Sequence, residues 1–159
     1  MLKHIHPIAG TIGFLIILAF WTSTVGSELF GSVELITAVK RTIPWGFSIL
    51  VPALAMTGLS GFRLAGGVST GPIASKRRRM KFIAGNGLLV LAPSAFYLAL
   101  LASHGAFDGR FYAVQAVELV AGAVNLALMA LNMRDGLRLT GRLTRPRSEK
   151  CPAAPPLSG

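Results

Sequence analysis

Four apolar segments, each about as long as a helix that crosses a lipid bilayer, constrain the fold of this 159-residue chain more than any other feature. They cover residues 7–25, 43–62, 82–102 and 111–133. A helix needs about 20 apolar residues to cross roughly 30 Å of hydrocarbon. Since 52% of the residues are hydrophobic, a small soluble core could not bury all four segments. The sequence predicts an all-α bundle of four transmembrane helices over residues 1–145, followed by a disordered cytoplasmic tail at 146–159.

The basic residues predict how the bundle is oriented, because lysine and arginine accumulate on the cytoplasmic side of membrane proteins. Of the 16 basic residues, 13 fall in the N-terminus, the second loop and the C-terminal tail, which four spans place on one side. The remaining three lie in the first and third loops: Lys40, Arg41 and Arg110. We therefore expect both termini in the cytoplasm and a multi-pass protein of the bacterial inner membrane. A cleaved signal peptide over residues 1–27 is the rival topology, and it would leave three spans.

A basic cluster precedes the third span and accounts for much of the net charge of +10. It lies directly beside an apolar segment and has no interleaved aromatic residues, so we expect anionic lipid headgroups as its partner and no nucleic acid. A protein partner or a second copy of the chain is a further possibility. The residues assigned to this contact are Lys76, Arg77, Arg78, Arg79 and Lys81.

The three connections between the spans differ in composition. Residues 26–42 have apolar residues at helical spacing, which predicts an interfacial helix or an extension of the first span. Residues 63–81 are rich in glycine, serine and proline, which predicts a flexible loop. Residues 103–110 form a short connection, so the third and fourth spans should be antiparallel neighbours.

Polar residues within the last two spans recur at alternating spacings of three and four, which places each set on one helix face. Antiparallel packing across the short connection then predicts which residues meet. The expected pairs are Tyr97 with Glu118, Val90 with Asn125, and Asn86 with Met129 or Asn132.

Glu118 is the acidic residue that lies deepest within a predicted span. An isolated carboxylate in hydrocarbon costs several kcal/mol, so its side chain should be neutral, hydrogen-bonded or in contact with water. One interpretation is a proton or ligand site made by Glu118, Tyr97 and Asn125. The other is a structural hydrogen bond between the third and fourth spans.

The histidines suggest a cofactor site as an alternative. His6 opens the first span, and Gly10 and Gly13 follow it at one and two helical turns, which could leave room for a haem. Histidine with methionine is a known axial pair, and we expect Met129 near the depth of His6. His104 closes the third span on the opposite side of the membrane, so it could not share one haem with His6.

The span count, the predicted location of both termini and His6 with its glycines resemble small four-helix bacterial inner-membrane proteins. The pattern also resembles uncharacterised bacterial membrane proteins of similar size. The same features loosely resemble b-type cytochromes of the cytochrome b561 kind. That resemblance implies haem b held by histidines within the bundle. The chain has three histidines, and those cytochromes use four for two haems, so at most one site of mixed ligation remains on each side.

Three functions are compatible with these patterns. The preferred one is a non-enzymatic accessory or partner-binding membrane component. The second is electron transfer with haem b or quinone, and the third is a small transporter with a polar cavity around Glu118. We find no motif of a known enzyme class, so catalysis stays undecided. The single cysteine excludes an internal disulfide and a cysteine-based metal cluster.

Overall fold

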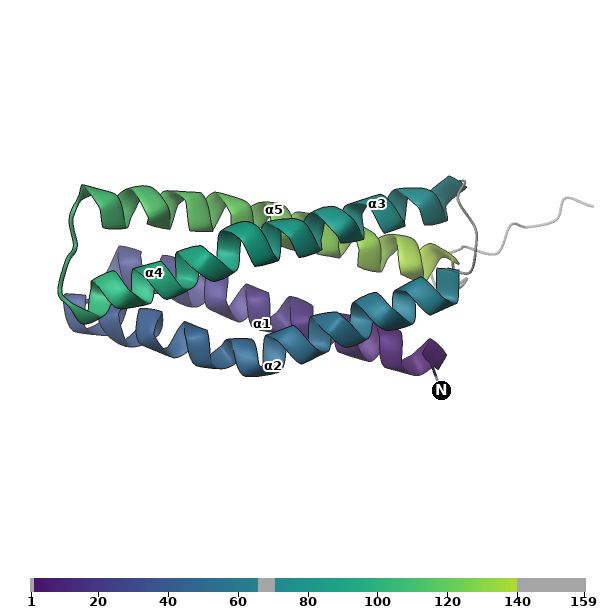
Figure 1. Cartoon of the computed structure of the whole chain (residues 1–159), viewed down its shortest axis with the longest axis horizontal. Helices are drawn as coiled ribbons and strands as arrows, with labels where there is room; N and C mark the ends of the chain where they lie inside the picture. Colours follow the sequence, from purple (N-terminus) through teal and green to yellow (C-terminus); the bar gives the residue numbers. More distant parts are fainter. Residues whose placement is uncertain (1, 66–70, 140–159) are drawn as a thin grey trace, which may run out of the picture.

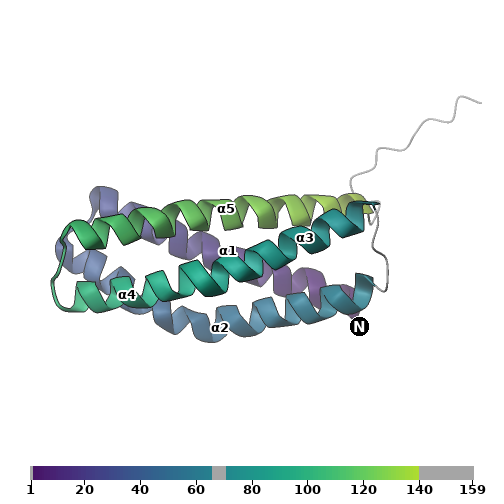
Figure 2. The ribbon, with the colours of Figure 1, turned by 45° about the horizontal axis from the view of Figure 1, so that its top comes forward.

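A computed structural model shows a bundle of four long helical rods that run alternately up and down (Figures 1 and 2). It describes residues 2–65 and 71–139, so the predicted tail at 146–159 lies outside the described residues. The first two rods are α1 (Leu2–Phe30) and α2 (Val33–Ala65). The third consists of α3 (Gly71–Asn86), a π-helical turn η1 (Gly87–Leu91) and α4 (Ala92–Ser103). The fourth rod is α5 (Gly109–Leu139).

Each rod packs closely against two neighbours, whereas the diagonal pair α2 and α5 meets through long side chains near the bundle axis. Helix α1 contacts α2 and α5, whereas the third rod lies between α2 and α5 on the other side. We call the end that holds the start of α1 the terminal end. The opposite end, with the α1–α2 and α4–α5 connections, is the hairpin end (Figure 1). This arrangement confirms the predicted all-α four-helix bundle.

The surface of the bundle is largely apolar, and its interior contains buried polar side chains as well as apolar ones. Large side chains on the outside include Trp45, Leu88 and Leu89, which are 80%, 72% and 75% exposed. All four rods contain a helix that is long and apolar enough to cross a membrane, and at most 22% of each apolar window is buried inside the bundle. By helix length and hydropathy, the chain is therefore a multi-pass membrane protein.

The third rod changes its helical pitch because of a proline. Pro93 has no backbone N–H, so it cannot donate a hydrogen bond to the preceding turn. The helix widens just before it, and the Ala92 N–H donates to the Gly87 carbonyl in η1. A π-helical turn inserts one extra residue and rotates the side chains that follow it.

The first two connections differ from the expectations in extent. Residues 26–42 are helical as predicted, but they extend both α1 and α2, and only Gly31 and Ser32 separate the two helices. The prediction of a flexible loop over 63–81 is wrong for most of its length, because residues 71–81 belong to α3. Glycine and proline occur near the start of α3, where a helix tolerates them.

The third connection is tight, as predicted. Gly105 adopts a positive φ of 67°, which favours glycine, and turns the chain after α4. Asp108 then caps α5, because its Oδ1 accepts hydrogen bonds from the N–H groups of Arg110 and Phe111.

Candidate functional site

A lysine and a glutamate form an ion pair inside the bundle, near its hairpin end. The Lys40 Nζ of α2 donates to the Glu118 Oε2 of α5 at 2.5 Å. The side chains of Lys40 and Glu118 are 1% and 13% exposed, so protein atoms surround nearly all of the pair. Removing two charges from water costs several kcal/mol for each ion, and the attraction between them offsets this cost only in part.

Two further polar residues accompany the pair. The Glu28 carboxylate of α1 lies close enough to interact electrostatically with both Lys40 and Glu118. Gln115 precedes Glu118 by three residues and therefore lies on the same face of α5. We call Glu28, Lys40, Gln115 and Glu118 the charged cluster. It joins α1, α2 and α5.

Several atoms of the charged cluster have no hydrogen-bond partner among the described residues. They are the Oε1 of Glu28 and both polar side-chain atoms of Gln115, and all three are buried. Gln115 is only 4% exposed. An unpaired buried amide or carboxylate oxygen costs about 1–3 kcal/mol or more, so this cluster is poorly explained as a device for stability.

The charges of the cluster do not cancel when all its ionisable groups are charged. Lys40 contributes one positive charge, and Glu28 and Glu118 contribute two negative charges, which leaves one negative charge. An unbalanced charge is unfavourable away from water, and one bound proton would make the cluster neutral. This stoichiometry is the main chemical property of the site.

The partner that the structure gives Glu118 is a lysine of α2, whereas the sequence pattern favoured Tyr97. Tyr97 of α4 is 41% exposed. The sequence predicts that Lys40 lies in the first loop, before the span at 43–62, and it predicts no role for Lys40 at the site. The apolar residues that flank it at helical spacing were the signal that residues 33–42 continue α2 and carry Lys40 into the bundle.

A second polar contact lies nearer the middle of the bundle and is neutral. Asn86 donates from Nδ2 to the Asn125 Oδ1 and to the Ala121 carbonyl, both at 3.0 Å. The Asn125 Nδ2 donates to the Ile83 carbonyl at 3.4 Å, and Asn125 is 1% exposed. The facing polar stripes of the third and fourth rods are thus present. Their register is about one helical turn away from the predicted pairing of Asn86 with Met129 or Asn132.

The predicted haem ligands lie apart. The His6 Nδ1 is 3.1 Å from the Thr57 carbonyl and 3.0 Å from the Ser60 Oγ. The methionine beside His6 is Met80, since a Cβ added at Gly61 would lie 2.9 Å from the His6 Cε1 and 3.3 Å from the Met80 Cε.

Met129 packs instead into the apolar core with Ile17, Leu50 and Ile83. His104 is exposed at the end of α4, with its Nδ1 2.8 Å from the Leu100 carbonyl. No group of three or more histidine, cysteine, aspartate or glutamate residues in the described ranges could hold a metal ion. The haem hypothesis thus stays a prediction.

The basic cluster on α3 is partly occupied by contacts within the protein. Arg79 binds the Asp135 Oδ2 at 2.7 Å, and the Arg77 guanidinium lies 5.2 Å from the centre of the Phe62 ring. Arg78 and Lys81 are exposed, and the side chain of Lys76 lies outside the described residues. Arg79 therefore ties α3 to α5, while Arg78 and Lys81 point away from the bundle.

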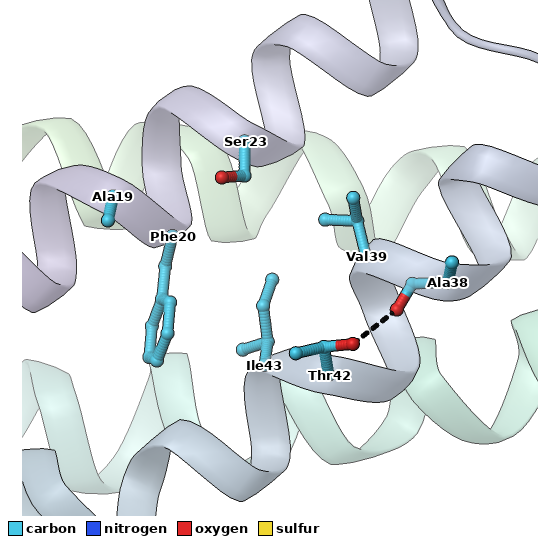
Figure 3. Close-up of a pocket in the computed structure, with 7 residues that line it drawn as sticks. All are labelled: Ala19, Phe20, Ser23, Ala38, Val39, Thr42 and Ile43. Carbon is cyan, nitrogen blue, oxygen red and sulfur yellow. Dashed lines mark hydrogen bonds between the residues drawn. The ribbon is translucent and has the colours of Figure 1, made fainter.

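A groove of about 350 Å³ runs between α1 and α2 near the hairpin end (Figure 3). Its polar groups are the hydroxyls of Ser23 and Thr42, and the Thr42 hydroxyl donates to the Ala38 carbonyl at 2.8 Å. The lining carries no charged side chain and suits hydrocarbon better than a polar ligand. The lining residues are Ala19, Phe20, Ser23, Ala38, Val39, Thr42 and Ile43.

Comparison of the chain with family models, curated proteins and solved structures finds no match. The structure shows a membrane protein with four candidate spans, and the charged cluster is the part of it with distinctive chemistry.

Proposed function

We propose that this protein is a small proton-coupled membrane transport protein, with the charged cluster as its proton-binding site. The observation that carries the proposal is the Lys40–Glu118 ion pair, which is buried beside a second carboxylate, Glu28. Ionisable residues within membrane spans are costly, and they commonly mark proton or substrate pathways. The terminal end would face the cytoplasm, because it carries most of the basic residues.

The competition of two carboxylates for one lysine suggests how a proton could act. With Glu118 ionised, Lys40 links α2 to α5. A proton on Glu118 removes that attraction, and Lys40 can then pair with Glu28, whose Oε1 has no partner in the described residues. The lysine would thus link α2 to α1 when Glu118 is protonated, so proton binding changes which helices are held together.

Proton flux into vesicles tests this function. The protein is reconstituted into liposomes that contain a pH-sensitive dye, and an outward potassium gradient with valinomycin drives proton entry. We expect flux above that of empty vesicles, and at least a tenfold loss in Glu118→Gln. The matched control is Glu34→Gln, because Glu34 is an exposed carboxylate at the same end of the bundle and should be dispensable. Equal flux in wild type, Glu118→Gln and empty vesicles would refute the proposal.

We also propose that Arg78 and Lys81 bind anionic lipid headgroups at the terminal end. Both side chains are exposed beside a span, and each basic residue near such a surface contributes about 1 kcal/mol of attraction. Thermal unfolding in vesicles with and without phosphatidylglycerol tests this contact. A stabilisation by the anionic lipid that survives Arg78→Gln with Lys81→Gln would contradict it.

A further inference from the structure

We infer that Gln115 and Glu28 bind a water molecule between the Lys40–Glu118 pair and the hairpin end, and that a proton reaches Glu118 through it. This inference rests on the proposed function and names the route into its site. It assigns a role to Gln115, which does not itself exchange a proton. Gln115 acts as a positioning residue by holding the water.

The unpaired atoms of Gln115 carry the argument. Gln115 is only 4% exposed, and both its Oε1 and its Nε2 lack a hydrogen-bond partner among the described residues. The Glu28 Oε1 is buried and unpaired as well. Buried polar groups in proteins are nearly always hydrogen-bonded, either to protein or to ordered water. Three such atoms near one ion pair indicate a bound polar molecule.

The position of these atoms suits a connection to the outside of the bundle. Gln115 lies six residues after the start of α5 at Gly109, which is about 9 Å along the helix axis. Glu118 lies one turn deeper on the same face. Glu28 is two residues from the end of α1 at Phe30. Both residues thus lie between the buried ion pair and the hairpin end.

The chemistry of the amide selects the ligand. An amide side chain offers one acceptor oxygen and two N–H donors. A cation would satisfy the oxygen and leave the N–H groups unpaired. An anion would do the opposite, and the Glu28 carboxylate would repel it. Water donates and accepts, and a buried water typically makes about three hydrogen bonds. It can satisfy the Gln115 amide and the Glu28 Oε1 together.

Infrared difference spectra of reconstituted protein between high and low pH test the water site. We expect an O–H stretching band that shifts when the sample is prepared in H₂¹⁸O and disappears in Gln115→Met, a variant of similar length. Asn132→Leu is the matched control, because it replaces another buried amide of α5 at the terminal end and should keep the band. We also expect Gln115→Met to slow proton flux at least tenfold.

The possible outcomes separate this inference from the proposed function. A wild-type spectrum without an H₂¹⁸O-sensitive band overturns the water site, and this measurement does not require the variant to fold. A band that persists in Gln115→Met also overturns it, and unchanged flux in Gln115→Met overturns the route. If Glu118→Gln leaves flux unchanged, the proposed function fails, whatever the spectra show.

Discussion

The charged cluster and the Asn86–Asn125 contact are both polar, and both join separate rods of the bundle. They differ in how many of their buried polar atoms have a hydrogen-bond partner. Asn86 and Asn125 carry no charge, and their amides bond to each other and to backbone carbonyls. The charged cluster has one surplus negative charge when fully ionised and leaves three buried atoms without a partner in the described structure. The asparagine contact is satisfied within the protein, whereas the charged cluster is not, and in our proposal a proton and a water molecule complete it.

We interpret this difference as one between a structural contact and a functional site within one membrane protein. A complete neutral hydrogen-bond network rigidifies a bundle and specifies its register. An incomplete and charged hydrogen-bond network lowers stability, so a role outside stability best accounts for it.

Trp21 of α1 lies between the two regions, because its indole N–H donates to the Leu119 carbonyl of α5 at 3.0 Å.

The largest effect is expected for Lys40→Met. This change leaves Glu118 and Glu28 buried without a cation, and removing one partner of a buried pair costs about 3–5 kcal/mol. We expect a large drop in the melting temperature in detergent at neutral pH. The loss should shrink as the pH falls, because protonation of the carboxylates removes the uncompensated charge.

The double variant Lys40→Met with Glu118→Leu sharpens this test. It removes the ion pair and leaves Glu28 as the remaining carboxylate of the cluster, so it should be more stable than Lys40→Met. A melting temperature that is no higher in the double variant would show that the ion pair is not what Lys40 contributes to folding.

A smaller loss is expected for Asn125→Leu. It leaves the Asn86 amide without its side-chain acceptor in the interior, at a cost of about 1–3 kcal/mol. Since both amides are hydrogen-bonded within the protein, we expect reduced thermal stability with proton flux per folded protein unchanged within twofold. A selective loss of flux with normal stability would break the distinction between the two regions.

Gly122→Ala tests the boundary between the regions. A Cβ at Gly122 would lie 2.9 Å from the Trp21 Cδ1, so the indole must shift away from α5. Overpacking of this kind costs about 1–3 kcal/mol, and it should weaken the hydrogen bond of Trp21 to Leu119. We expect a lower melting temperature and a shifted tryptophan fluorescence maximum. Gly58→Ala is the control, because nothing lies within 4 Å of the Cβ it would add.

The sequence predicted the bundle well and the site in part, and particular residues show why. The four apolar segments defined the rods, because span length is set by the bilayer and can be read locally. Glu118 was found because a carboxylate within an apolar segment is conspicuous. Its partner is not predicted, because Lys40 lies about two turns from the start of α2, where a basic residue normally faces water. The asparagine register was off by one turn, because it depends on where α4 ends and α5 begins and on the π-helical turn before Pro93.

The smallest effect is expected for Tyr97→Phe, and it tests the partner of Glu118. Tyr97 is 41% exposed on α4, and the structure gives Glu118 the ammonium of Lys40 as its hydrogen-bond donor. Removing the phenol oxygen should therefore change the free energy of unfolding by less than about 0.5 kcal/mol, as is usual for exposed positions. We expect proton flux to stay within twofold of wild type as well. A tenfold loss of flux in Tyr97→Phe would mean that the phenol, and not only Lys40, serves Glu118. The charged cluster would then extend to α4, and the contrast with the neutral asparagine contact would include all four rods.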